Sequence, residues 1–230
     1  MKRLGRKRLP QGKRAPELSR FYGRIGAQGW RGSKYFTFSV RSPMLRRWLA
    51  GQLPARPVRL LSIGCGSGEL EAHLLREGHG VVGLDLSTAM LKRARKRGLE
   101  ALVQADSESL PFRAARFDVV LFPECVGYLN LPIAFAEAAR VLRRRGRLLI
   151  TTYSGAVELH AAYRRVALAE IAEALAAAGL RVAEQRFLAA KRTAVTAVPS
   201  DDGSTLLYVL ARHAQQRSAA PPVLTARRTN

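Results

Sequence analysis

Cysteine is scarce in this chain, and its scarcity excludes two classes of protein. The 230 residues include two cysteines, Cys65 and Cys125, and neither belongs to a Cys-x-x-Cys motif or a Cys/His cluster. We therefore expect neither a zinc site nor a disulfide framework, and we predict no metal. Each cysteine lies in an apolar segment, which is typical of a small buried side chain.

Long apolar runs are also missing. No uninterrupted run is long enough to cross a bilayer, and the basic start of the chain lacks the apolar stretch of a secretory signal. The composition, 47% hydrophobic and 24% charged, is that of a globular protein with one core domain. We expect a cytoplasmic protein.

Acidic residues are few, with 17 Asp and Glu against 39 Lys and Arg and a net charge of +22. This excess has two interpretations. It either marks a polyanionic partner, such as RNA or an acidic lipid surface, or reflects the compositional bias of a chain rich in Arg and Ala. Residues 1–16 are predicted to be a disordered basic arm and are the better nucleic-acid or acidic-surface candidate.

The composition changes along the chain and suggests four regions. The arm is followed by residues 17–57, which mix aromatic and basic residues and are predicted to form a helical or lid segment. Residues 58–212 are predicted to be the core, and residues 213–230 a disordered tail.

Within the core, apolar runs alternate with amphipathic segments. Strands are predicted at 58–63, 80–84, 100–104, 117–122, 147–152, 180–188 and 205–211, and helices at 69–76, 88–97, 132–142 and 168–178, with a further helix at 43–53 before the core. This alternation predicts an α/β, Rossmann-like fold: a seven-stranded, mostly parallel sheet with helices on both faces. The link between the last two strands is too short for a helix, so the last strand should be antiparallel.

The first strand of the core leads into a glycine turn. Gly64, Gly66 and Gly68 allow sharp turning and close approach of a ligand, and the helix that follows offers free N–H groups. Asp85 and Asp106 follow the next two strands, so all three features should meet at the carboxyl edge of the sheet. A carboxylate at position 85 can accept both hydroxyls of a ribose. Glu69 stands where the dinucleotide fingerprint has its third glycine, and its charge disfavours a pyrophosphate.

Five segments carry a resemblance to a known family. They are 60–70 (LLSIGCGSGEL), 81–91 (VVGLDLSTAML), 103–112 (VQADSESLPF), 117–129 (FDVVLFPECVGYL) and 138–152 (AARVLRRRGRLLITT). In this order and spacing, the chain resembles the class I S-adenosylmethionine-dependent methyltransferases, within the ubiquinone/menaquinone-methyltransferase-like (methyltransferase type 11) group. The resemblance implies S-adenosyl-L-methionine as cofactor.

The resemblance also implies roles for individual residues. The turn Gly64, Cys65, Gly66 and Gly68 surrounds the methionine part of the cofactor, Asp85 binds the ribose, and Leu86 lies against the adenine. Asp106 accepts from the adenine amino group with Ser107 alongside, Pro123 and Glu124 border the methyl group, and Tyr22, together with Lys34 and Tyr35, closes over the site. Two departures stand out: Ser62 replaces an acid that helps to position the cofactor, and Arg144-Arg145-Gly146 replaces the family's Pro-Gly-Gly turn.

The methyl acceptor is not identified by the sequence. A general base is needed only when the acceptor is protonated, and the candidates are His160, Tyr128, Tyr153 and Glu124. His73 is expected to be a packed or surface residue. Our main hypothesis is a small-molecule methyltransferase. The alternatives are an RNA methyltransferase that uses the basic arm, and a non-catalytic protein that binds S-adenosylmethionine as a scaffold.

Overall fold

The computed structural model describes residues 17–22, 24, 43–153, 163–188, 195–196 and 206–214. The predicted arm, Lys34, Tyr35, His160 and residues 215–230 of the predicted tail lie outside these ranges. The elements are α2 (Pro43–Gln52), β1 (Arg59–Ile63), α3 (Glu69–Arg76), β2 (Gly80–Asp85), α4 (Thr88–Arg95), β3 (Leu102–Gln104), β4 (Phe117–Pro123), a 3-10 turn η1 (Val126–Tyr128), α5 (Leu131–Val141), β5 (Leu142–Tyr153), α6 (Leu168–Ala177), β6 (Leu180–Leu188), β7 (Val195–Thr196) and β8 (Leu206–His213).

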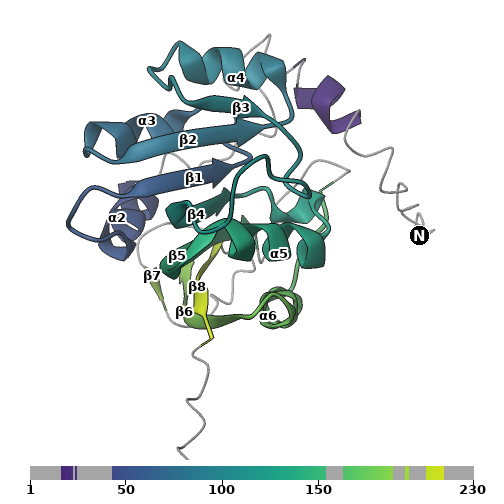
Figure 1. The fold of residues 1–230 in the computed structure, drawn as a ribbon. Helices are drawn as coiled ribbons and strands as arrows, with labels where there is room; N and C mark the ends of the chain where they lie inside the picture. Colours follow the sequence, from purple (N-terminus) through teal and green to yellow (C-terminus); the bar gives the residue numbers. More distant parts are fainter. Residues whose placement is uncertain are drawn as a thin grey trace, which may run out of the picture.

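The strands form one sheet in the order β3-β2-β1-β4-β5-β8-β6-β7 (Figure 1). Strands β1 to β5 pair in parallel, and β8 lies between β5 and β6 and is antiparallel to both. This confirms the predicted mostly parallel sheet with an antiparallel last strand. The order changes direction at β1, between β2 and β4, which is the position where open α/β sheets bind ligands.

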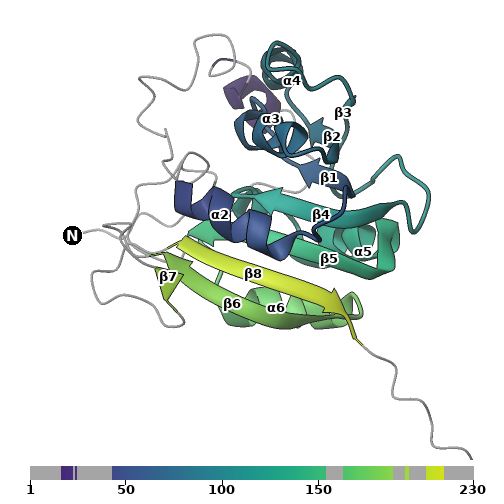
Figure 2. The same cartoon turned by 90° about the vertical axis from the view of Figure 1, so that its left-hand side faces the viewer.

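Alternate residues of the central strands face two separate apolar layers. Leu61 and Ile63 of β1 pack in the layer that contains α5 and α6. Leu60 of the same strand packs in the layer that contains α2 and α3. Figure 2 shows α2 on one side of the sheet and α5 and α6 on the other. Burial on both faces explains why these strands are continuous apolar runs in the sequence.

The structure differs from the predicted elements in two places. An additional strand, β7, has two residues and pairs with β6, and so short a strand has no periodicity to detect. The turn expected at Arg144-Arg145-Gly146 is an irregularity inside β5, because the pairing shifts from Phe117↔Leu142 to Val119↔Arg147. Extra residues on one strand of a pair are accommodated in this way as a bulge.

Candidate functional site

The glycine turn follows β1 at the carboxyl edge of the sheet. Gly64, Gly66 and Gly68 have φ of 75°, 53° and 72°, in the left-handed region that favours glycine. A Cβ on Gly64 would lie 2.8 Å from the Cβ of Cys125, and one on Gly68 would lie 2.9 Å from the Cβ of Ala94, whereas Gly66 faces open space. Gly64 and Gly68 therefore allow neighbouring side chains to pack closely, whereas at Gly66 a ligand can approach the backbone.

Asp85, the last residue of β2, connects this turn to the start of α4. Its Oδ2 accepts from the Gly66 N–H at 2.8 Å, and its Oδ1 accepts from the Ser87 N–H at 2.8 Å. Desolvation by burial raises the pKa of the carboxyl above its usual value. Each oxygen keeps capacity for a second donor, so the carboxylate can also accept ribose hydroxyls.

A buried hydrogen bond lies beneath the turn. Ser62 of β1, fully buried, donates from Oγ to Oε1 of Glu71 in α3 at 2.5 Å. Burial raises the pKa of Glu71 to about 7, and the hydrogen bond from Ser62 opposes that rise. The sequence analysis missed Glu71. Its position between the buried Leu70 and Leu74 of α3 was the available signal, because an acid on an inward helix face needs a partner.

The residues predicted beside the adenine lie around the ends of β2 and β3. Leu86 follows Asp85, and its carbonyl accepts from Gln104 Nε2 at 3.2 Å and from Ser19 Oγ at 3.4 Å. The half-buried Asp106 accepts from the Glu108 N–H at 3.0 Å, and the buried Ser107 is its neighbour. Asp85 therefore ends β2, Leu86 follows it, and Asp106 lies two residues beyond the end of the adjacent β3, at the same edge of the sheet.

Glu124 has an unusual backbone just beyond β4, which ends at Pro123. Its φ of 56° is in the left-handed region, although it is not a glycine. Its N–H donates to the carbonyl of Thr151 at 2.8 Å and lies 3.1 Å from Thr151 Oγ1. Tyr153 donates its hydroxyl to the Glu124 carboxylate. A strained backbone conformation that is held by hydrogen bonds to a neighbouring strand is common at functional sites.

Four tyrosines form a chain of contacts that begins at this carboxylate. The rings of Tyr128 and Tyr163 pack edge-to-face with centroids 4.8 Å apart, and Tyr153 packs on Tyr163 at 5.8 Å. Tyr22 donates its hydroxyl to that of Tyr128 at 2.5 Å. Burial, then the proximity of Tyr128, raises the pKa of Tyr22, while burial raises that of Tyr163, so both are neutral phenols at pH 7. Sequence reasoning missed Tyr163, which follows a segment without a regular pattern.

Residues 17–22 form a helical segment at the carboxyl edge, at the right of Figure 1. Ser19 contacts the carbonyl of Leu86 near the predicted adenine side, and Tyr22 contacts Tyr128 near Glu124. The segment therefore contacts both the end of β2, through Ser19, and the tyrosines near Glu124, through Tyr22. The family resemblance implied that Tyr22 lies over this site.

The two cysteines are packed and unreactive. Cys125 donates its thiol to the carbonyl of Ile63 at 3.1 Å, and Cys65 is buried. Burial raises the pKa of both thiols, so neither is a thiolate at neutral pH. Within the described ranges, no group of three or more His, Cys, Asp and Glu is arranged to hold a metal ion.

Glu69 is the first residue of α3, and its charge is partly compensated. Arg97 forms an ion pair with it at 2.9 Å and also donates to the carbonyl of Ser67 at 2.9 Å. The repulsion of a pyrophosphate is thus weaker than the sequence suggests. The helix start has no side-chain cap, since Gly68 occupies that position, so its first N–H groups can meet a ligand carboxylate.

Comparison with known proteins identifies the central part of the chain. Residues 61–150 match the family described as methyltransferase domain. The ubiquinone biosynthesis O-methyltransferase of Xylella fastidiosa (strain 9a5c) is 31% identical over 118 residues, covering 48% of each chain. The ubiquinone/menaquinone biosynthesis C-methyltransferase of Rhizobium meliloti is 38% identical over 110 residues, covering 42% of each. The chain thus spans about half the length of the curated relatives it matches.

Solved structures share the fold over most of both chains. Geranyl diphosphate C-methyltransferase from Streptomyces coelicolor, solved with S-adenosyl-L-homocysteine, has a TM-score of 0.70 at 16% identity and covers 89% of this chain and 99% of its own. The 1,6-didemethyltoxoflavin-N1-methyltransferase of Burkholderia thailandensis has a TM-score of 0.66 at 22% identity, with 90% and 92% covered. Every helix in the described part of our chain is too short or too polar to span a membrane.

Proposed function

We propose that this chain, whose residues 61–150 form a class I S-adenosylmethionine-dependent methyltransferase domain, transfers a methyl group to a small-molecule acceptor. The observation that carries the proposal is the open side of Gly66 next to the Asp85 carboxylate. A Cβ at position 66 would occupy the space where a ligand meets the backbone, and the carboxylate provides acceptors for ribose hydroxyls beside it.

The fit of S-adenosylmethionine can be followed along the site. The uncapped N–H groups of α3 and the turn 64–68 receive the amino-acid end, with Cys65 packed behind. Asp85 accepts from the ribose, Leu86 packs on the adenine, and Asp106 with Ser107 accepts from the adenine amino group. All of these residues end or follow β1, β2 and β3, so one ligand reaches them together.

The bound sulfonium supplies an activated methyl group, so this chain's own residues mainly align the acceptor and exclude water. Pro123 and Glu124 border the acceptor side, and the hydrogen bond from Tyr153 fixes the Glu124 carboxylate. A carboxylate so placed can take a proton from an acceptor hydroxyl or attract a protonated amine. In this proposal Tyr128 and Tyr153 line the same side, and Tyr22 belongs to a lid formed by residues 17–57.

The proposed domain organisation has three further parts: the basic arm 1–16, the core 58–212 and the tail 213–230.

Relatives named as methyltransferases of ubiquinone and of ubiquinone/menaquinone biosynthesis support a small acceptor. Purified protein with methyl-labelled S-adenosylmethionine should label one of four acceptor classes: phenols, quinols, amines or carboxylic acids. Label found only in RNA would instead favour an RNA methyltransferase that uses residues 1–16. Tight cofactor binding without transfer to any acceptor would favour a non-catalytic scaffold.

A cytoplasmic location belongs to the proposal, supported by two free thiols.

Glu124→Gln tests the acceptor side directly, because it keeps the size of the side chain and removes its charge. If Glu124 accepts the acceptor proton, this variant should lower kcat by at least about a hundredfold and leave cofactor affinity unchanged. An unchanged kcat would exclude that role.

A further inference from the structure

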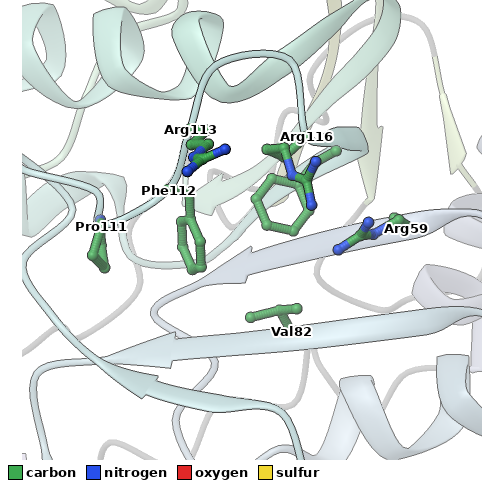
Figure 3. Close-up of a pocket in the computed structure, with 7 residues that line it drawn as sticks. Arg59, Val82, Pro111, Phe112, Arg113 and Arg116 are labelled. Carbon is green, nitrogen blue, oxygen red and sulfur yellow. The ribbon is translucent and has the colours of Figure 1, made fainter.

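A cavity lies at the opposite edge of the sheet from the glycine turn. Its volume is about 270 Å³, and it is lined by Arg59, Val82, Pro111, Phe112, Arg113, Arg116 and Phe117 (Figure 3). Arg59 and Phe117 are the first residues of β1 and β4, whereas the glycine turn follows the last residue of β1. The cavity is therefore separated from the candidate cofactor site by the length of β1.

The three arginines of this cavity give it a positive charge, which Asp118 offsets in part, since its Oδ2 accepts from the Arg59 backbone N–H at 3.0 Å. The side chains of Arg59, Arg113 and Arg116 are exposed, and none forms an ion pair with another described residue. The nearby acid, Asp118, is already engaged by Arg143 at 2.8 Å and by Arg56 at 3.5 Å. Three guanidinium groups around one cavity favour an anion, and arginine matches the geometry of phosphate oxygens.

An apolar wall accompanies this charge. The ring of the half-buried Phe112 packs edge-to-face on the buried Phe117, with centroids 5.1 Å apart, and the half-buried Val82 lies below. Figure 3 shows the Phe112 ring on the same side of the cavity as Pro111, with Arg116 and Arg59 beyond it. A flat apolar surface next to guanidinium groups suits a ring that carries an anionic group.

The loop that forms this cavity is held in place by the end of α5. Arg140 donates to the carbonyls of Phe112 at 2.7 Å and Leu110 at 3.0 Å, while the N–H groups of Ala115 and Arg116 donate to the carbonyls of Arg140 and Val141. Ala115 has φ of 53°, a strained conformation that these hydrogen bonds maintain. The site is thus organised before a ligand arrives, which lowers the entropy cost of binding.

We propose that this cavity binds a small ring-bearing phosphate, with the phosphate on the three arginines and the ring on Phe112. This site is distinct from the methyl-transfer site and does not depend on the proposed function. Its ligand is neither the methyl donor nor the acceptor.

Calorimetric titration with phenyl phosphate tests the proposal, with S-adenosyl-L-homocysteine present at saturation. We expect saturable binding with one site per chain. The double substitution Arg113→Ala/Arg116→Ala should weaken it about tenfold or more, because it removes two of the three guanidinium groups that would hold the phosphate. Arg144→Ala/Arg145→Ala removes the same charge from the neighbouring β5, outside the cavity, and should change the affinity less than about twofold.

Phe112→Leu tests the contribution of the aromatic contact separately from that of the phosphate. It should weaken phenyl phosphate several-fold and leave the affinity for inorganic phosphate unchanged. Absence of saturable binding would overturn the proposal. So would equal weakening by the two double substitutions, or tight binding of a single-stranded oligoribonucleotide alone, since either would indicate non-specific attraction by the basic surface.

Discussion

At the residue scale, the buried acid beneath the glycine turn is Glu71, which comes from helix α3 and not from strand β1. The family resemblance implied that Ser62 replaces an acid that helps to position the cofactor. In the structure Ser62 donates to Glu71, so a buried carboxyl from α3 lies beneath the turn instead. The position of Glu71 beside Leu70 indicated an inward-facing acid, but the partner on β1 could not be predicted because the pairing joins residues of different elements.

Glu71 should make the stability of the protein depend on pH. Burial raises its folded-state pKa to about 7, above the ordinary value of 4.5 for a glutamic acid, so the folded state binds more protons than the unfolded state between these values. The free energy of unfolding should therefore fall as pH rises from about 4.5 to 7, by up to roughly 3 kcal/mol from this group. Glu71→Gln should remove that part of the dependence in chemical denaturation at several pH values.

Asp85 contributes in the same direction, since its pKa is also raised by burial. Asp85→Asn is therefore the second variant of the series, and the double variant should show the flattest profile. A wild-type stability that rises between pH 5 and 7, or a Glu71→Gln profile equal to the wild type, would contradict the assignment.

Gly66 and Gly68 offer a matched pair of substitutions. Both have positive φ, so alanine costs about 1–2 kcal/mol of backbone strain at either position. At Gly68 the new Cβ would also meet Ala94 at 2.9 Å, whereas at Gly66 it meets open space. Gly68→Ala should lower the melting temperature more, and Gly66→Ala should weaken S-adenosyl-L-homocysteine binding more. Equal effects of both on affinity would argue against a ligand at Gly66.

At the scale of elements, the chain's periodicity predicted most of the fold. The strand predicted at 80–84 is β2 (Gly80–Asp85), and the helix predicted at 69–76 is α3 (Glu69–Arg76). Gly98 and Gly179, both with positive φ, directly follow the helices predicted at 88–97 and 168–178. The longer extent of β5 was not foreseen, because the glycine and arginines at its start are typical of a turn.

Helix α5 should be the most sensitive element of its layer. Phe135 is fully buried and packs on Phe122 with ring centroids 5.5 Å apart, whereas Ile133 on the same helix is 42% exposed. Phe135→Ala should lower the free energy of unfolding by about 3–5 kcal/mol, and Ile133→Ala by less than about 1 kcal/mol. Urea denaturation of both variants measures this difference. Similar losses would mean that α5 does not pack as described.

At the scale of the whole molecule, the convergence of strand ends was predictable and the contacts among the tyrosines near Glu124 were not. Asp85 and Asp106 follow successive parallel strands, so topology alone places them together. Tyr22 and Tyr128 are 106 positions apart and meet through their hydroxyls. Contacts over such separations depend on how residues 17–22 pack against the sheet edge, which no local pattern encodes.

The net charge of +22 is also a property of the whole molecule. If residues 1–16 contact RNA, their removal should weaken binding to a single-stranded oligoribonucleotide and reduce its dependence on salt. Filter binding between about 50 and 200 mM salt compares the full and truncated chains. An unchanged affinity would leave compositional bias as the explanation of the charge.

The most direct test of the central claim is calorimetric titration of S-adenosylmethionine into the protein and its Asp85→Ala variant. We expect one site per chain in the wild type and at least about tenfold weaker binding in the variant, because Asp85 both accepts from the ligand and holds the Gly66 N–H. Glu100→Gln, which alters an exposed acid before β3, should bind normally, and circular dichroism should show all three proteins folded. No binding by the folded wild type, or equal affinity of Asp85→Ala, would contradict the account.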